Sequence, residues 1–300
     1  MYFSDNAFQV VWIGVSGESL DSLKTEELRK LSQGYGNMMM AVVLIVGLTV
    51  GLGVGYFLPG LLGPPPEDVP DDYDIIMDRG TINVGTNSGW PPFEMVNTTT
   101  DELEGFDIDL AEYVAADMGV TVNWIDMDFD ALIAACTGGT IDMIASATFI
   151  TRERSAVLQP LVWYIRTNEV IVVKGTSVLE IDELADLDGY NGGVQTGTTE
   201  DEGLSAIAGV NETLTRYTLV ETMFADLDTG TLDYVFVDEP IVDLYSQVYP
   251  GIKIIFTNPA PPTAFYIRYG SDALSAAINS AIAEGFADGT IDALIAKWFG

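Results

Sequence analysis

Residues 143–154 read M-I-A-S-A-T-F-I-T-R-E-R, a short apolar run followed by small and hydroxyl residues and then by two arginines. The apolar start predicts a buried strand, and the residues after it predict a loop at the strand's end. The chain has only 12 Lys and Arg against 45 Asp and Glu. Because cations are scarce, an arginine in this place indicates a specific partner, and we expect Arg154 to bind a carboxylate.

Composition excludes several classes of function. The formal net charge of −33 repels nucleic acids, so no nucleic-acid partner is expected. Such acidity is typical of salt-adapted proteins and also of ordinary acidic exported proteins. The chain has no histidine, which excludes histidine-based catalysis and histidine metal ligands. Its single cysteine, Cys136, has no intrachain disulfide partner and is predicted to be a small buried residue. We expect no cofactor and no metal.

The amino-terminal part contains a candidate membrane anchor. Residues 38–57 carry one polar side chain, Thr49, and no charge, and as a helix they would span about 30 Å. Three cations precede this run, whereas the Pro-rich acidic linker that follows has none. The asymmetry predicts a cytoplasmic tail at 1–37, a transmembrane anchor at 38–62 and an external linker at 63–73. A cleaved signal peptide is the alternative, but the run is long and begins late for one.

The remaining chain alternates strands with helices. Residues 81–85, 120–125 and 141–145 have strand-like patterns, and helical patterns at 106–118 and 129–135 lie between them. This order predicts an α/β domain with a largely parallel sheet. In such sheets ligands bind at the carboxyl ends of the strands. The loops expected there carry Asn87 as a polar group, Trp90 and Phe129 as apolar walls, and Arg154.

Several motifs then occur in an order that resembles a known family, the extracellular solute-binding proteins of ABC transporters for polar amino acids. The matching runs are Val84-Gly85-Thr86 with Pro92-Phe93, Gly105-Phe106-Asp107-Ile108-Asp109-Leu110, Phe129-Asp130-Ala131-Leu132-Ile133, Ile150-Thr151-Arg152-Glu153-Arg154, Val194-Gln195-Thr196-Gly197-Thr198-Thr199, Ala287-Asp288-Gly289-Thr290 and Lys297-Trp298-Phe299-Gly300. The resemblance implies a two-lobe periplasmic-binding-protein-like (type II) α/β fold with two hinge-crossing strands. It places lobe one at 74–169 plus 258–300 and lobe two at 170–257.

The resemblance also implies the roles of individual residues. Gly197 and Thr199 would share the ligand's carboxylate with Arg154, and Asp238 would pair with its α-ammonium group. Without the resemblance, the Gly-Thr-Thr turn reads as an ordinary capped helix start. The expected ligand-binding set is Asn87, Trp90, Phe129, Ala147, Phe149, Arg154, Gln195, Gly197, Thr199 and Asp238, with no catalytic residue.

The sequence departs from the family pattern at Phe149, where a small hydroxyl residue is common. A side-chain hydrogen bond to the ligand is then lost, or Thr148 supplies it. Motif spacing favours Arg154 over Arg152, which is expected at the surface. Members that bind basic ligands tend to carry an acid at the position of Asn87. A neutral amide there, together with Gln195, favours a neutral polar amino acid such as glutamine.

These features predict a membrane-tethered extracellular receptor that delivers an amino acid to the permease subunits of an ABC importer, and not an enzyme. Two alternatives stay open. The same cage could serve a sensory ectodomain of a signalling complex, although residues 1–37 contain no recognisable output domain. A dehydratase or lyase on this fold would need a placed acid or base, for which only Glu94 and Asp238 are candidates.

Overall fold

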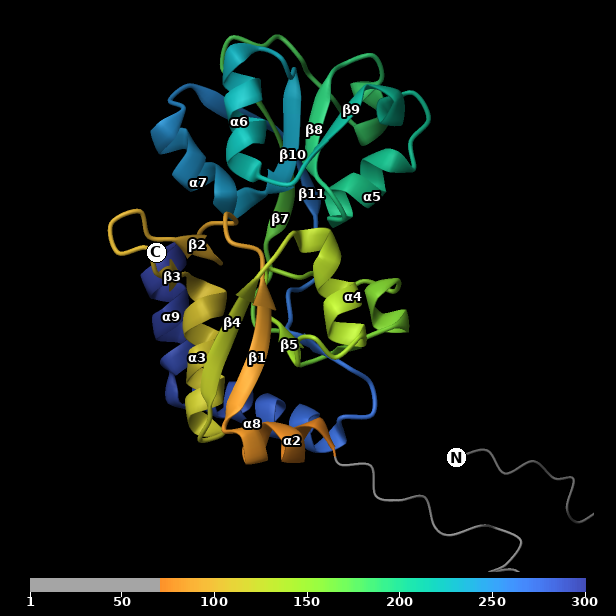
Figure 1. Cartoon of the computed structure of the whole chain (residues 1–300). Coiled ribbons are helices and arrows are strands. Elements are labelled where there is room, and N and C mark those ends of the chain that lie inside the picture. Colours follow the sequence, from red (N-terminus) through yellow and green to blue (C-terminus); the bar gives the residue numbers. More distant parts are fainter. Residues whose placement is uncertain (1–70) are drawn as a thin grey trace, which may run out of the picture. The chain divides into compact units, whose positions relative to one another are not determined.

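A computed structural model describes residues 71–300 (Figure 1). The α-helices are α2 (Asp72–Arg79), α3 (Phe106–Asp117), α4 (Leu132–Thr137), α5 (Thr199–Ser205), α6 (Val220–Thr229), α7 (Glu239–Val248), α8 (Asp272–Asp288) and α9 (Thr290–Phe299). The strands are β1 (Thr81–Thr86), β2 (Met95–Val96), β3 (Leu103–Glu104), β4 (Thr121–Asp126), β5 (Met143–Ile144), β6 (Gln159–Pro160), β7 (Asn168–Lys174), β8 (Gly192–Gln195), β9 (Leu214–Tyr217), β10 (Tyr234–Asp238), β11 (Ile252–Pro259) and β12 (Tyr266–Ile267). Short 3₁₀ helices are η2 (Phe129–Ala131), η3 (Arg154–Ala156), η4 (Leu184–Leu187) and η5 (Val210–Thr213).

The first sheet has the strand order β4-β1-β5-β12-β6 and defines lobe one. Strands β4, β1 and β5 are parallel, and β12 returns from the carboxyl-terminal part of the chain to pair antiparallel with β5. Helix α4 packs on β1 and β5, while α3 packs on β4 and on α8 and α9 (Figure 1). Parallel β1 and β5 end at the same edge, which brings the loops after them together.

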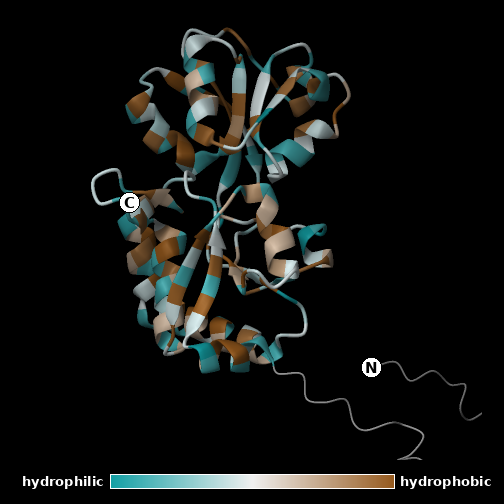
Figure 2. Cartoon of the chain, viewed as in Figure 1, coloured by the Kyte–Doolittle hydropathy of each residue, from teal (hydrophilic) through white to brown (hydrophobic). Residues whose placement is uncertain are grey.

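The second sheet, ordered β11-β7-β10-β8-β9, defines lobe two, and its inner strands β7, β10 and β8 are buried on both faces. In β10, Val235 and Val237 join the core with α6 and α7, whereas Tyr234 and Phe236 join a separate core with η4 and α5. A strand covered on both sides reads as a continuous apolar run. Figure 2 shows hydrophobic residues along these strands and on the helices that cover them. Asp238 is the last residue of β10 and lies at the edge of the sheet that faces lobe one.

The chain crosses between the lobes twice, and the two crossings pair with each other. Strands β7 and β11 are antiparallel, with Asn168 opposite Pro259. An isolated bridge continues this pairing from Ile165 to Thr263, and a second bridge joins Thr263 to Phe149. The paired crossings therefore form a two-stranded hinge that places the edge of one sheet opposite the edge of the other.

Two expectations differ from the structure in detail. Asp72 and Tyr73, assigned to the linker, instead begin α2, because the Asp71 carboxylate accepts a hydrogen bond from the backbone N–H of Tyr73 and caps the helix. The strand predicted at 141–145 is reduced to Met143–Ile144. The predicted tail and anchor, and the linker up to residue 70, lie outside the described residues. Within 71–300, no helix has the length and apolar character needed to cross a membrane.

Candidate functional site

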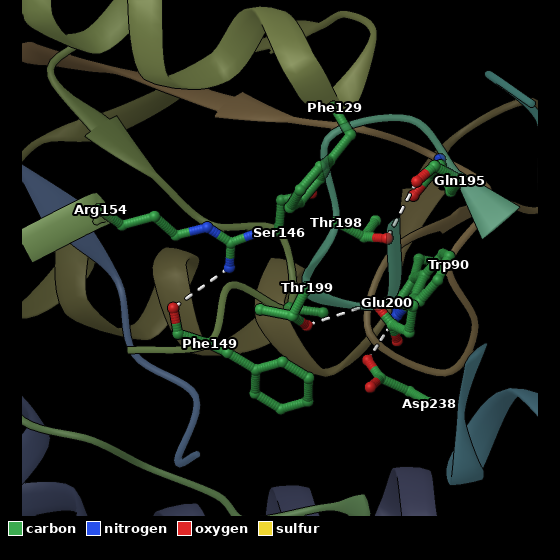
Figure 3. A pocket seen from close by; sticks show the side chains of 11 residues that line it. Trp90, Phe129, Ser146, Phe149, Arg154, Gln195, Thr198, Thr199, Glu200 and Asp238 are labelled. Atoms are coloured by element: carbon green, nitrogen blue, oxygen red, sulfur yellow. Dashed lines mark hydrogen bonds between the residues drawn. The ribbon is translucent and has the colours of Figure 1, made fainter. Parts of the chain in front are cut away.

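A small cavity lies between the two lobes. Its walls come from loops and element ends of both sheets, as Figure 3 shows. The lining residues are Trp90, Phe129, Ser146, Ala147, Phe149, Arg154, Gln195, Thr198, Thr199, Glu200 and Asp238.

Arg154 provides the cation of the cavity. It begins η3, is 3% exposed, and reaches inward from lobe one. Its Nη1 donates to the Phe149 carbonyl at 3.2 Å, and its Nη2 donates to the Gly197 carbonyl of lobe two at 3.3 Å. The guanidinium also lies over the Phe129 ring, 5.3 Å from the ring centre. Burial lowers the pKa of Arg154, but a guanidinium stays charged in proteins.

Asp238 provides an anion on the opposite side of the cavity (Figure 3). It precedes α7 at the N-cap position, yet its side chain makes no capping hydrogen bond. Its Oδ2 instead accepts from Trp90 Nε1 of lobe one at 2.9 Å, and its Oδ1 finds no partner among the described residues. A buried carboxylate oxygen without a donor is costly. Burial, followed by the charge of Glu200, raises the pKa of Asp238 well above its ordinary value.

Glu200 is a second buried acid of the cavity, and sequence reasoning missed it. It lies in the first turn of α5 and is 1% exposed. Its Oε2 accepts from the Thr199 hydroxyl at 3.3 Å, and its Oε1 is unpartnered within residues 71–300. Burial raises the pKa of Glu200 to about 7, and the charge of Glu169 acts in the same direction. Nothing in the acidic run 200–202 indicates which of the three acids turns inward.

Ser146 and Thr198 also line the cavity without having been predicted. The Ser146 hydroxyl accepts from the Asn87 backbone N–H at 3.0 Å and donates to Glu94 Oε1 at 2.8 Å. Thr198 is the N-cap of α5, because its hydroxyl accepts from the backbone N–H of Asp201. Thr199, the next residue, lines the cavity as well.

Ala147 is held against the cavity by an unusual backbone conformation. Its φ is +43°, in the left-handed region that non-glycine residues rarely adopt. Its N–H donates to Asp107 Oδ2 at 2.8 Å, and the same oxygen accepts from the Tyr164 hydroxyl at 2.8 Å. Burial raises the pKa of Asp107 to about 7, against the effect of these two donors. Such local strain is common where a loop must present particular groups to a ligand.

The other predicted residues divide into two groups. Gln195 and the Phe149 ring line the cavity. Asn87 and Gly197 do not line it, but Asn87 is hydrogen-bonded to Gln195 and Gly197 is hydrogen-bonded to Arg154. The possibility that Thr148 replaces the missing hydroxyl finds no support, because its side chain donates to the Ser146 carbonyl and does not line the cavity.

Several hydrogen bonds connect the lobes across the cleft. They include Trp90 to Asp238, Arg154 to Gly197, and Gln195 Nε2 to Asn87 Oδ1 at 2.7 Å. These contacts show that the lobes meet in the described conformation, with the cavity between them.

The resulting chemistry is that of recognition. One guanidinium lies on one side of an enclosed cavity and two carboxyl groups lie on the other, with aromatic rings between them (Figure 3). This arrangement complements a small molecule that carries both a negative and a positive group. Within residues 71–300, no cluster of three or more acids and cysteines has the geometry to hold a metal ion.

Two α/β lobes with a paired double crossing and a polar cavity between them define a two-lobe ligand-binding protein. Residues 82–300 match the family model of the bacterial extracellular solute-binding proteins, family 3, and the chain belongs to this family. Its members are binding proteins, so the class predicted from the motifs, the two-lobe fold and the non-enzymatic character are confirmed.

Named relatives agree with this assignment. The chain is 29% identical to the ABC transporter arginine-binding protein 1 of Escherichia coli K12, over 73% of this chain and 90% of the relative. It is 28% identical to the L-cystine-binding protein TcyJ of the same strain, over 88% and 96% respectively. Among solved structures, a mutant of ArgBP from T. maritima superposes with a TM-score of 0.73 at 32% identity, covering 76% of this chain and 98% of that one.

Proposed function

We propose that this chain is the amino-acid receptor of an ABC importer. The observation that carries the proposal is the pairing of buried Arg154 from lobe one with buried Asp238 from lobe two across one closed cavity. An α-amino acid presents a carboxylate and an ammonium group at a fixed short separation. Each charge-assisted hydrogen bond to such a group contributes roughly 1.5–3 kcal/mol. The names of the relatives, which include an ABC transporter arginine-binding protein and an L-cystine-binding protein, support the same ligand class.

Delivery to a permease would follow from closure of the hinge. The β7 and β11 crossings are the only paired connection that the described residues make between the lobes as strands. A ligand that contacts both lobes stabilises the closed form, and a permease that binds this form distinguishes loaded from empty receptor. The apolar run at 38–57 supports tethering to the membrane with the lobes outside, as expected for this family.

For the ligand's side chain we propose a neutral polar group such as a carboxamide. Gln195 Nε2 is already engaged with Asn87 and with the Thr218 carbonyl. Its Oε1 accepts no hydrogen bond from another described residue, so it is open to a donor N–H of the ligand. One relative is named as an arginine-binding protein, so the experiment must compare neutral with cationic side chains.

The test is a thermal-shift screen of the full-length protein, purified in mild detergent at high salt, against each of the twenty common amino acids. We expect at least one to bind with a dissociation constant in the micromolar range or tighter. Arg154→Ala should weaken this binding roughly 100-fold, the loss of one to two charge-assisted contacts. Arg152→Ala is the matched control, because Arg152 is exposed on the same segment.

Each part of the proposal has its own refutation. Absence of a shift with all twenty amino acids would overturn the amino-acid receptor. Unchanged binding in Arg154→Ala would overturn the assignment of the carboxylate site. Stronger shifts with arginine or lysine than with glutamine and asparagine would replace the neutral side chain by a cationic one.

A further inference from the structure

Two carboxyl groups lie on the lobe-two side of the cavity, and the family resemblance accounts only for Asp238, not for Glu200. Asp238 ends β10 and Glu200 lies on α5, and they are 2% and 1% exposed. Trp90 Nε1 holds one oxygen of Asp238, and the Thr199 hydroxyl holds one oxygen of Glu200. The remaining oxygens, Asp238 Oδ1 and Glu200 Oε1, have no partner among the described residues although both side chains line the cavity.

The charges around this pair are mostly negative. Glu169 on β7 faces both carboxyl groups, and Glu94 lies behind Ser146 near Asp238. Arg154 is the cation that acts on Glu200 from across the cavity. Both side chains line the same cavity, and the charge of Glu200 disfavours ionisation of Asp238. Two adjacent buried carboxyl groups do not both ionise readily in such surroundings, because each charge disfavours the other.

We propose that Glu200 and Asp238 together form the cation subsite of the cleft, and that in the empty protein they share one proton which the ligand's ammonium group displaces. The inference rests on the proposed amino-acid receptor and adds a proton to its binding reaction. The empty pair carries one proton and one negative charge. When the ammonium group arrives already protonated, the shared proton leaves to solvent, and both carboxylates accept hydrogen bonds from the ammonium.

The sign of the pH dependence follows from this exchange. Burial raises the pKa of Glu200 to about 7 in the empty cleft, while a bound cation favours the ionised form and lowers it. Burial raises the pKa of Asp238 as well, so binding must release the pair's proton and weakens as pH falls through the range in which the pair holds it. Between pH 7.5 and pH 5.5 the dissociation constant should therefore rise by roughly 10- to 30-fold.

The chain is well suited to detect this proton. It has no histidine, so no imidazole titrates between pH 5.5 and 8. Asp107 is a second carboxyl group with a pKa raised to about 7, but it lies in lobe one against Ala147 and Tyr164. A difference between the wild type and a Glu200 variant therefore isolates the cleft pair from Asp107.

The experiment has two arms on the full-length protein in detergent. In the first, potentiometric titration of the empty protein from pH 5.5 to 8 is compared between wild type and Glu200→Gln. In the second, an equimolar mixture of the twenty amino acids is added at pH 6, and the released proton is counted against a protein-free blank. Thermal shifts with the same mixture at pH 5.5 and 7.5 report the binding itself.

We expect Glu200→Gln to remove close to one proton from the titration curve and to abolish proton release on binding. The dissociation constant of this variant should change less than threefold between pH 5.5 and 7.5. Asp238→Asn should remove the same titration step, so this variant provides the test if Glu200→Gln does not fold. Glu212→Gln, an exposed acid of lobe two, should leave the curve unchanged. The proton exchange is overturned if the amino acids shift the unfolding temperature without releasing a proton, or if the titration step persists in both variants. Neither result contradicts the proposed receptor function. No thermal shift at any pH overturns the receptor itself.

Discussion

The two sides of the cavity carry opposite charges and differ in how far the protein itself satisfies them. On the lobe-one side, the Arg154 guanidinium donates to two backbone carbonyls and lies over the Phe129 ring, and only its Nε has no partner among the described residues. On the lobe-two side, Asp238 and Glu200 each keep a buried oxygen without a donor. The cation is therefore held in place by the fold, whereas the carboxyl groups are held at a cost that a bound ammonium group would remove.

This difference separates binding from folding. A group that the fold already satisfies contributes to the stability of the empty protein, and its removal harms both stability and binding. A group that the fold leaves unsatisfied opposes the stability of the empty protein, and its removal harms binding alone.

The largest effect is expected for Asp238→Asn. Binding of the best amino acid should weaken about 100-fold or more, since a charge-assisted contact is lost. Arg154→Ala should lower the unfolding temperature of the empty protein, whereas Asp238→Asn should not. Because the pKa of Asp238 is raised in the folded state, its ionisation destabilises the fold as pH rises above the ordinary pKa of an aspartate. Asp238→Asn removes this effect, so the empty variant should unfold at the same or a higher temperature at pH 7.5.

Calorimetric titration and thermal unfolding of the empty protein measure the two quantities. Asp243→Asn is the control, because Asp243 is exposed on α7, five residues further along the chain. The comparison between the two sides fails if Asp238→Asn lowers the unfolding temperature as much as Arg154→Ala does.

The sequence alone predicts the two-lobe fold and much of this site for identifiable reasons. Arg154, Asp238 and Trp90 lie at the ends of strands or in the loops after them, so position marks all three, and the scarcity of cations marks Arg154 in addition. The buried strands of lobe two read directly as apolar runs because both of their faces are covered.

Other features depend on contacts that no local pattern contains. Glu200 is one acid among 45 and differs from its neighbours only in the direction that α5 gives it. Asn87 was expected at the cavity, but it stands behind Gln195 because the lobes meet there. The left-handed conformation of Ala147 requires the buried Asp107 acceptor, which lies 40 residues earlier in the sequence. Long-range packing decides each of these, so only the folded structure reveals them.

A smaller effect is expected for Phe129→Leu. The ring covers one wall of the cavity and faces the Arg154 guanidinium, a contact worth about 0.5–2 kcal/mol. Leucine keeps apolar cover but has no ring face to hold the cation. The dissociation constant should rise roughly 3- to 20-fold in calorimetric titration.

Phe286→Leu serves as the control for this substitution, since Phe286 is a partly exposed phenylalanine on α8 away from the cavity. Equal affinities for Phe129→Leu and the wild type would mean that the two carbonyl contacts alone hold the guanidinium.

The smallest effect is expected for the polar contact between the lobes, tested by Asn87→Ala. Asn87 Oδ1 accepts from Gln195 Nε2, yet Asn87 does not line the cavity, so its removal weakens closure without removing a cavity-lining group. A hydrogen bond of this kind contributes about 0.5–1.5 kcal/mol, so the apparent dissociation constant should rise roughly 2- to 10-fold. Asn123→Ala is the matched control, because Asn123 donates to Asn83 within lobe one and that bond does not cross the cleft. If the two variants weaken binding equally, the contact between Asn87 and Gln195 does not contribute to closure, and the affinity of the closed form depends on the charged groups of the cavity.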